Sequence, residues 1–593
     1  MCGIAGEIAF RGSRADLESV RKMTEAMAER GPDGQGTWHG GWAGLGHRRL
    51  KVIDLTEAAA QPMVEDRFGL AVVFNGCIYN HHELRAELAE GYPFRSASDT
   101  EVILAAYDRW GEDFVEHLVG MFVIALVDQR RQCVVLARDR LGVKPLYLAQ
   151  VGGRLRFAST LPALVAAGGV DTSINEVGLH HYLSWHSIVP APATILAGVT
   201  KLPPATVRVV DIAGRTRDRV YWQPDYTRRP EHAGWDAQQW RDAVHGALRT
   251  AVQRRLVADV PVGVLLSGGL DSSLIVALLT EAGQQGLSTF SIGFDDAGDR
   301  AGDEFAYSDL VAEVFGTDHH RLHIGAIDLP QAVEDTVAVM TEPMTSHDVT
   351  AFYLLSQAVA EHVKVVQSGQ GADEVFAGYA YHHSAATAPR EAALDTFAGA
   401  FVDHDQAQLL AILEPEWLHP SDPSRARLAD HLVAPGAATA LDAVLRLDTH
   451  LLMADDPVKR VDNMTMAAGL EARVPFLDQD LVELAAACPP ELKTAQSGKG
   501  ILKDLGRRLL PAEVVDRPKG YFPVPALVHL QEPILAMVRE ALYAPEAKDR
   551  GLFRTDLLED LLAEPNARHA PTGPNVLWQL GLLEMWLQRH GVG

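Results

Sequence analysis

The fold of the second half of this chain is decided by Val264-Leu265-Leu266-Ser267-Gly268-Gly269-Leu270-Asp271-Ser272-Ser273. Its apolar start predicts a buried strand, Ser-Gly-Gly predicts a loop, and an apolar helix follows from Asp271. Glycines let backbone N–H groups approach an anion closely, and the start of a helix favours phosphate through its dipole. The stretch therefore predicts a phosphate-binding loop between a strand and a helix. The alternative is a glycine turn in which Asp271 and the serines only cap the helix.

A second strand, glycine loop and acidic helix start is found at Val365-Val366-Gln367-Ser368-Gly369-Gln370-Gly371-Ala372-Asp373-Glu374. In a parallel sheet such loops lie at the carboxyl ends of the strands, where ligands bind. The first loop lacks the lysine of the GxxxxGK[ST] phosphate loop, and magnesium takes carboxylate and phosphate oxygens together. Asp271 and Asp373 are therefore expected to reach the same metal–pyrophosphate complex. Helix capping alone is the alternative for Asp373 and Glu374.

Hydrophobic periodicity divides the chain into two parts of different character. Short β-type runs with interleaved helical patterns fill the first ~200 residues, which predicts an α+β layered domain. After a polar stretch at 223–234, a strand-loop-helix at 261–282 and strands at 289–294 and 363–367 alternate with helices. This alternation predicts a parallel sheet with crossover helices. The expected division is an N-terminal domain at 1–215, a linker at 216–235 and a C-terminal α/β domain at 236–593.

Composition narrows the classes of protein to which the chain can belong. Its 593 residues carry a net charge of −25, which argues against nucleic acid or an anionic membrane as a general partner. The four cysteines form no CxxC pair, which fits a reducing compartment and gives no zinc framework. Apolar runs such as 121–127 and 260–266 are far shorter than the ~20 residues of a membrane span, and no leader is apparent. We therefore expect a soluble, cytoplasmic protein.

Cys2 follows the initiator methionine directly, and removal of that methionine would leave a cysteine whose own α-amine lies beside its thiol. Such an amine has a pKa near ~7.7–8.0, so it can act as a base around neutral pH. A nucleophile next to its own base is the arrangement of N-terminal-nucleophile catalysis. The alternative is an ordinary cysteine at a frayed terminus.

Three further motifs offer a pocket around such a nucleophile. Arg49 in Gly46-His47-Arg48-Arg49-Leu50 carries a fork-shaped guanidinium that suits a carboxylate. The Asn75 side chain and the Gly76 N–H, which follow a predicted strand, suit an oxyanion hole. Asp99 offers a carboxylate for an amino group. Singly, these residues also fit a surface arginine, a turn and a helix cap. Together they predict a pocket that binds an α-amino acid at both ends and attacks its side-chain amide.

Both parts of the chain resemble one family. Cys2 together with RGPDG (30–34), GHRRL (46–50), NGCIYN (75–80), SDTE (98–101) and RDRLGVKPLY (138–147) resembles a class II glutamine amidotransferase domain. SGGLDSS (267–273), SGQGADEVFAGY (368–379) and LEARVPFLD (470–478) resemble the synthetase half of the glutamine-hydrolysing asparagine synthetases. The motifs keep the family's order from residue 1 to at least 520. The resemblance implies an Ntn-hydrolase αββα sandwich followed by a PP-loop ATP pyrophosphatase α/β domain with added helices.

The resemblance also implies two coupled reactions. Cys2 would attack the glutamine amide and form a thioester, and the released ammonia would pass through an internal tunnel. At the second site ATP and Mg²⁺ would convert a carboxylate to an acyl-adenylate, from which ammonia displaces AMP. The implied partners are the small molecules L-glutamine, ATP and a carboxylate acceptor, with no nucleic acid and no membrane, and with homodimer formation left open.

Residue roles follow from the matched motifs. The resemblance implies that Arg49 holds the glutamine carboxylate, that Asp99 binds the amino group, and that Asn75 and Gly76 form the oxyanion hole. Lys499 matches the catalytic lysine, with Lys503 as the fallback. The implied ATP and pyrophosphate site comprises Leu266, Ser267, Gly268, Gly269, Asp271, Ser272, Ile292, Ser368 and Gly369. The implied acceptor or adenylate site comprises Gln370, Asp373 and Glu374, and the metal ligands are Asp271 and Asp373.

Two positions depart from the family pattern. Where the family has glutamate in NGEIYN, this chain has Cys77. Where the family has the first glutamate of SGEGSDE, this chain has Gln370, a neutral amide that cannot act as a base. With the segment Lys519–Pro525, these departures resemble the N-acetylglutaminylglutamine amidotransferase branch, which makes an osmoprotectant. The expected acceptor is therefore N-acetylglutaminylglutamine, and L-aspartate is the alternative. An adenylating cyclase of the β-lactam synthetase kind and a non-catalytic glutamine or nucleotide sensor are more distant alternatives.

Overall fold

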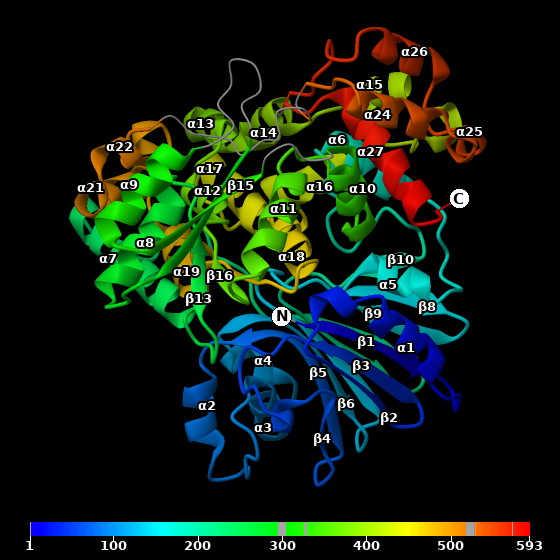
Figure 1. Ribbon diagram of the computed structural model, residues 1–593, viewed down its shortest axis with the longest axis vertical. Helices are drawn as coiled ribbons and strands as arrows, with labels where there is room; N and C mark the ends of the chain where they lie inside the picture. Colours follow the sequence, from blue (N-terminus) through cyan, green and yellow to red (C-terminus); the bar gives the residue numbers. More distant parts are fainter. Residues whose placement is uncertain are drawn as a thin grey trace.

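The computed structural model describes residues 2–294, 304–324, 329–517, 527, 529–571 and 573–592. The segment Lys519–Pro525, on which part of the acceptor prediction rests, lies outside the described residues. Figure 1 shows the N-terminal strands at one end of the molecule, below a helix-rich part built around a second kind of sheet. In the described ranges no helix combines the length and the apolar character that crossing a membrane requires.

The N-terminal part is built on two six-stranded antiparallel sheets. The first has the order β10-β8-β9-β1-β3-β2, with β1 Gly3–Ala9, β2 Gly34–His39, β3 Ala43–Arg49, β8 Tyr147–Val151, β9 Arg154–Ala158 and β10 Val199–Lys201. The second has the order β12-β11-β7-β6-β5-β4, with β4 Met63–Glu65, β5 Leu70–Ile78, β6 Gly120–Asp128, β7 Cys133–Arg138, β11 Thr206–Asp211 and β12 Thr216–Val220.

Alternating side chains explain why these sheets stack. In β5, Ala71 and Val73 pack with Ile4 and Ile8 of β1 in a core between the two sheets, whereas Phe74 belongs to a different core on the opposite face. Helices cover both outer faces, which gives four layers. The covering helices are α1 Leu17–Glu25, α5 Leu161–Ala166 and α6 Glu176–Ser184 by the first sheet, and α2 His81–Leu88, α3 Asp99–Trp110 and α4 Phe114–His117 by the second.

The segment 216–235, which the sequence predicts to be a linker, begins with a β-strand. Its first residues form β12, Thr216–Val220, which pairs antiparallel with β11. This corrects the prediction for those residues. Strand β12 is mostly exposed and lies at the edge of its sheet, so it carries charges instead of the apolar alternation that identifies a half-buried strand.

The C-terminal part contains a five-stranded parallel sheet, as the alternation of strands and helices predicts. Its order is β15-β14-β13-β16-β17, with β13 Val262–Leu265, β14 Ser288–Phe294, β15 Asp318–Ile324, β16 Val365–Gln367 and β17 Glu471–Arg473. Val264 packs into a core with α7 Ala237–Arg254 and α8 Leu270–Glu281. Leu265 packs on the other face with α10 Leu329–Val339 and α11 Val349–Ala360. Helices therefore cover both faces of this sheet (Figure 1).

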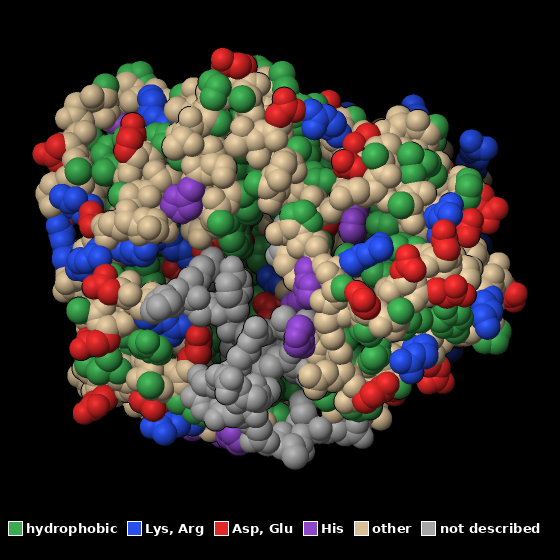
Figure 2. Space-filling view, turned by 90° about the horizontal axis from the view of Figure 1, so that it is seen from above, with side chains coloured by type: hydrophobic (Ala, Val, Ile, Leu, Met, Phe, Trp, Pro, Cys, Tyr) green, Lys and Arg blue, Asp and Glu red, His purple; other side chains and the backbone are tan. Residues whose placement is uncertain are grey.

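The remaining α-helices surround this sheet and extend the C-terminal part. They are α9 Phe305–Phe315, α12 Ala372–Phe376, α13 Ala380–Thr387, α14 Ala393–Phe401, α15 Gln406–Ile412, α16 Pro423–Leu432, α17 Ala440–Leu447, α18 Pro457–Met466, α19 Gln479–Ala487, α20 Pro490–Thr494, α21 Gly500–Leu509, α22 Ala512–Val515, α24 Ile534–Tyr543, α25 Pro545–Arg550, α26 Thr555–Ala563 and α27 Val576–Arg589. Figure 2 shows acidic and basic side chains interspersed over the upper face of this part.

Candidate active site

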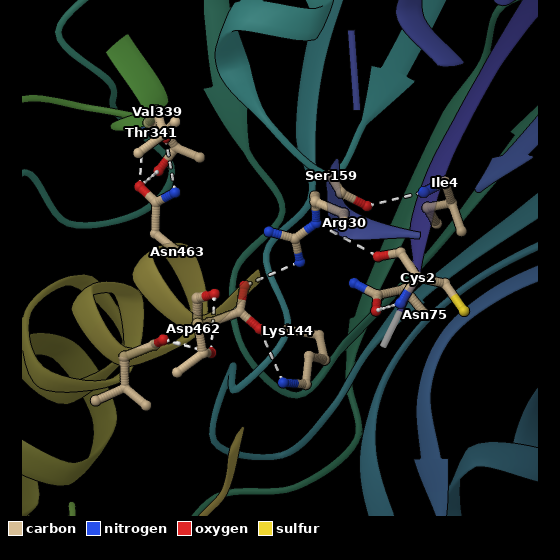
Figure 3. Close-up of polar contacts among 12 residues, drawn as sticks. Cys2, Ile4, Arg30, Asn75, Lys144, Ser159, Val339, Thr341, Asp462 and Asn463 are labelled. Atoms are coloured by element: carbon tan, nitrogen blue, oxygen red, sulfur yellow. Dashed lines mark hydrogen bonds and ion pairs between the residues drawn. The ribbon is translucent and has the colours of Figure 1, made fainter. Parts of the chain in front are cut away.

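Cys2 lies directly before β1 and is buried. Its backbone nitrogen donates a hydrogen bond to Asn75 Oδ1 at 3.0 Å, and Arg30 Nε donates to the Cys2 carbonyl oxygen at 3.4 Å (Figure 3). Burial raises the pKa of the Cys2 thiol above its usual range. The thiol is therefore neutral at rest, and an attack by this sulfur requires a neighbouring base.

Asn75 and Gly76, which the sequence predicts to form an oxyanion hole, lie in β5 beside Cys2. Asn75 is fully buried, and its Nδ2 has no hydrogen-bond partner among the described residues, so this amide keeps donor capacity for a ligand. A Cβ on Gly76 would lie 2.1 Å from the Met121 carbonyl oxygen of β6. Glycine is thus required here by the close approach of two strands, and its backbone lines the same cavity as Cys2.

Arg49 and Asp99 lie in the cavity that contains Cys2. The Arg49 guanidinium, at the end of β3, donates to the Thr56 carbonyl oxygen at 2.9 Å and to the carbonyl oxygen of Asp54. Asp99, at the start of α3, accepts the Ile78 N–H at 3.1 Å, and burial raises its pKa to about 6. The cavity is lined by Cys2, Arg49, Leu50, Val52, Ile53, Ala59, Gln61, Phe74, Gly76, Cys77, Ser98, Asp99, Thr100, Glu471 and Arg473.

The first and second parts of the chain meet beside Cys2 through a buried ion-pair network (Figure 3). Asp462 of α18 accepts from Arg30 Nη2 at 3.0 Å and from Lys144 Nζ at 2.8 Å. Although burial opposes ionisation, these two cations keep the pKa of the Asp462 carboxyl below its usual range. Because Arg30 also contacts the Cys2 carbonyl, Cys2 is tied to a helix of the other part of the chain.

The two glycine loops meet at the carboxyl ends of the adjacent strands β13 and β16, as the sequence predicts. A Cβ on Gly369 would lie 3.0 Å from the Asp271 Cβ, so the loops are in contact. Lys499 Nζ donates to Asp271 Oδ2 at 2.6 Å and lies 2.9 Å from Asp373 Oδ2. Burial alone would lower the pKa of Lys499, but the two carboxylates raise it above its usual range. These three charged side chains therefore form one cluster.

Lys503, the fallback for Lys499, points elsewhere: its Nζ donates to the Gln496 carbonyl oxygen at 2.5 Å. Lys499 precedes α21 with φ 54°, a left-handed backbone that places its side chain at the carboxylate pair. A Cβ on Gly378 would lie 2.0 Å from Asp373 Oδ1 and 2.4 Å from Lys499 Cε, so this glycine leaves the space that the cluster needs. Two carboxylates and a lysine at two glycine loops fit a magnesium–nucleotide complex.

Family models match both parts of the chain: "Glutamine amidotransferase domain" covers residues 1–222 and "Asparagine synthase" covers residues 243–588. This chain belongs to the asparagine synthase family. Glutamine-hydrolysing asparagine synthetase 1 of Bacillus subtilis strain 168 is 29% identical over 99% of this chain and 96% of that protein. Asparagine synthetase B of Escherichia coli K12 is 31% identical over 97% of this chain and 94% of that protein. The chain is thus a glutamine-hydrolysing ligase of the asparagine synthetase type.

The other residues predicted for the ATP site differ in whether their side chain or only their backbone is accessible to a nucleotide. Leu266 and Ile292 are buried in the cores, so only their backbone is available to a nucleotide. Gly268 has φ +69°, and a Cβ there would lie 2.6 Å from the Ser308 nitrogen. The hydroxyls of Ser267 and Ser272 lie 3.2 Å apart within the loop, where Ser267 Oγ also accepts the Gly269 N–H at 3.3 Å.

The residues that the sequence predicts for the acceptor site belong to the second glycine loop and the first turn of α12. Ser368 N–H donates to the Arg473 carbonyl oxygen at 2.8 Å, and Gln370 lies partly exposed in the following turn. Glu374 is buried in the first turn of α12 and accepts the Tyr379 hydroxyl at 2.5 Å. Burial and the neighbouring Asp373 raise the pKa of Glu374 to about 7.

Sequence reasoning assigned no role to three residues that the structure brings to these sites. Glu471 and Arg473 of β17 line the cavity of Cys2, although they belong to the synthetase part of the chain. Arg517 Nη1 donates to the Gly268 carbonyl oxygen at 3.1 Å. The LEARVPFLD motif contains Glu471 and Arg473 and could have indicated them, but only by resemblance.

Proposed function

We propose that this asparagine synthetase-type ligase releases ammonia from L-glutamine at Cys2 and transfers it to a carboxylate activated by ATP. The observation that carries this proposal is the cavity that Cys2, Gly76, Arg49 and Asp99 line together, with Asn75 Oδ1 accepting the Cys2 N–H at 3.0 Å. In the proposed division, an Ntn-hydrolase sandwich that extends from residue 1 through β12 performs hydrolysis, and a PP-loop domain at 236–593 performs synthesis. The four N-terminal layers and the parallel C-terminal sheet support this division.

At the first site, Arg49 binds the α-carboxylate of glutamine and Asp99 binds its α-ammonium. After removal of Met1, the Cys2 amine donates one hydrogen to Asn75 Oδ1 and keeps its lone pair for the thiol proton. The sulfur attacks the amide carbon, and the developing oxyanion accepts hydrogen bonds from Asn75 Nδ2 and the Gly76 N–H. The protonated amine then passes its proton to the leaving nitrogen, ammonia departs, and water hydrolyses the thioester to glutamate.

At the second site, Asp271 and Asp373 would hold magnesium, which neutralises pyrophosphate charge when bound. Lys499 would then turn from the carboxylates to the phosphates, and the N–H groups of the Ser267 and Ser368 loops would cradle the leaving pyrophosphate. The acceptor carboxylate attacks the α-phosphorus of ATP and releases pyrophosphate. Ammonia subsequently attacks the acyl carbon and releases AMP.

N-acetylglutaminylglutamine is the proposed acceptor, with L-aspartate as the alternative. This choice rests on the resemblance carried by Cys77, Gln370 and the segment Lys519–Pro525. One physical point supports an unusual amidation step: Gln370 is a neutral amide and cannot take the proton that ammonia loses on attack. Glu374, whose pKa is raised to about 7, is the nearby carboxylate suited to that proton.

The acceptor is tested by incubating the protein with ATP, Mg²⁺ and glutamine, and measuring AMP with each acceptor. We expect AMP formation to be at least about tenfold faster with N-acetylglutaminylglutamine than with L-aspartate, because one site discriminates acceptors by differential transition-state binding. Replacing glutamine with an ammonium salt serves as the control, since it bypasses the first site. AMP formation with aspartate alone would contradict the proposed acceptor while leaving the ligase assignment intact.

Glutamine hydrolysis should depend on the ionisation of Asp99. Burial raises its pKa to about 6, so below that pH the carboxyl becomes neutral and no longer attracts the glutamine ammonium. We expect kcat/KM for glutamine to fall by about tenfold per pH unit well below pH 6. In Asp99→Asn, kcat/KM should be lower at neutral pH and lack this decline near pH 6. An unchanged pH profile in Asp99→Asn would contradict the role given to Asp99.

A further inference from the structure

The wall of the glutamine cavity opposite the N-terminal strands is formed by the synthetase part of the chain. Glu471 and Arg473 of β17 line the same cavity as Cys2, Arg49 and Asp99, and both are almost fully buried. A carboxylate and a guanidinium without solvent access are costly to keep unless they have charged partners. The question is therefore which partners stabilise these two buried charges and what they do in the cavity.

Glu471 and Arg473 stabilise each other, because they form an ion pair within β17. Glu471 Oε1 lies 2.6 Å from Arg473 Nε, and Arg473 Nη1 donates to the carbonyl oxygens of Arg255 and Val257, each at 2.8 Å. These contacts fix the arginine, which in turn holds the carboxylate in place. Although burial opposes ionisation, Arg473 keeps the pKa of Glu471 below its usual range. Glu471 is therefore an ionised, immobile carboxylate in the cavity wall.

The N-terminal part contributes one carboxylate, Asp99, to the described lining of the cavity. Glutamine brings one carboxylate, for which Arg49 is available, and one ammonium. Asp99 is the carboxylate that the N-terminal part contributes to the cavity lining for that ammonium, and burial raises its pKa to about 6. Cys77, which also lines the cavity, carries a thiol whose pKa burial raises far above its usual range, so it stays neutral.

We propose that Glu471 is a glutamine-binding residue that shares the α-ammonium of the substrate with Asp99. The carboxylate that Cys77 does not provide from β5 is thus supplied from β17, across the boundary between the two parts of the chain. This inference rests on the proposed hydrolysis of glutamine at Cys2 and specifies how that substrate is held. The same strand contacts the ATP site, because the Arg473 carbonyl oxygen accepts the Ser368 N–H at 2.8 Å. Glutamine binding therefore depends on a strand that also holds the pyrophosphate loop.

The decisive variant is Glu471→Gln, which keeps the shape and an oxygen for Arg473 but removes the charge. Losing a charged hydrogen bond should raise the KM for L-glutamine by about 10- to 100-fold. The kcat for hydrolysis should change little, because Cys2, Asn75 and Gly76 are untouched. Ammonia-dependent AMP formation should be retained, which reports on an intact synthetase part.

A substrate analogue separates binding of the ammonium from a general disturbance of the cavity. Glutaric acid monoamide lacks the α-amine of glutamine but keeps its carboxylate and amide. Its inhibition constant against glutamine should be the same in the wild-type protein and in Glu471→Gln. An equal loss of affinity for glutamine and for this analogue would overturn the proposal, as would an unchanged KM for glutamine.

The chain also offers a rescue with a matched control. Adding Cys77→Glu to Glu471→Gln should restore the KM for glutamine to within about threefold of the wild type, because a carboxylate returns to the same cavity. Adding Cys77→Gln, of similar size and without charge, should not restore it. Equal effects of both substitutions would overturn the proposal. If the wild-type protein hydrolyses no glutamine, the proposed function fails instead, and this result is distinct from all those above.

Discussion

Replacing Cys2 with alanine should lower glutamine-dependent synthesis by at least about 10³-fold, because the thioester has no other nucleophile. Ammonia-dependent synthesis should persist at close to the wild-type rate. The two activities separate because the second site receives free ammonia directly, and Asp271, Asp373 and Lys499 belong to the other part of the chain. The measurement is AMP formation with the acceptor, ATP and Mg²⁺, using either glutamine or an ammonium salt.

Cys133→Ala provides the matched control for this variant. Cys133 is also a buried cysteine of the N-terminal part, in β7, but it is not among the residues that line the cavity of Cys2. Both activities should be close to wild type in Cys133→Ala. If glutamine-dependent synthesis survived in Cys2→Ala, the nucleophile would be assigned wrongly. If both activities were lost there, Cys2 would be required for the fold and the two sites would not be separable in this way.

Local patterns predicted the elements that carry the second site. The apolar run before Ser267 forms β13, and the helix expected from Asp271 is α8, because a buried strand and an apolar helix both leave short-range signals. Val365 similarly begins β16, which pairs with β13 in parallel. The meeting of Asp271 with Asp373 follows from that pairing, since parallel strands bring their carboxyl ends to one edge.

Contacts between distant parts of the chain left no such signal. Arg30 pairs with Asp462, which lies 432 positions further along the chain. When the partner is unknown, a charged residue on a helix is predicted to be exposed to solvent. Glu471 and Arg473 likewise read as parts of a short strand in the synthetase half. Only the folded structure shows that this strand faces the cavity of Cys2. Tertiary pairing of buried charges is therefore what sequence patterns leave undetermined here.

Replacing Lys499 with methionine should lower AMP and pyrophosphate formation by about 10²–10³-fold with either nitrogen donor, because the site loses a preorganised cation for the phosphates. Glutamine hydrolysis at Cys2 should continue, so ammonia would be released without synthesis. The same change should leave the Asp271 and Asp373 carboxylates without the lysine that lies 2.6 Å and 2.9 Å from them. Without that lysine the two carboxylates should bind a cation more tightly, so the Mg²⁺ concentration for half-maximal residual activity should fall.

Lys503→Met tests whether this effect is specific to Lys499 or follows the loss of either lysine at the start of α21. Lys503 lies one turn further along the helix, and its Nζ is engaged with the Gln496 carbonyl oxygen, away from the carboxylate pair. AMP formation in Lys503→Met should therefore stay within about threefold of wild type, as for a surface change outside the site. A large loss in Lys503→Met with little effect in Lys499→Met would transfer the catalytic role to Lys503. A loss of glutamine hydrolysis in Lys499→Met would instead mean that Cys2 depends on the charge cluster of the distant site.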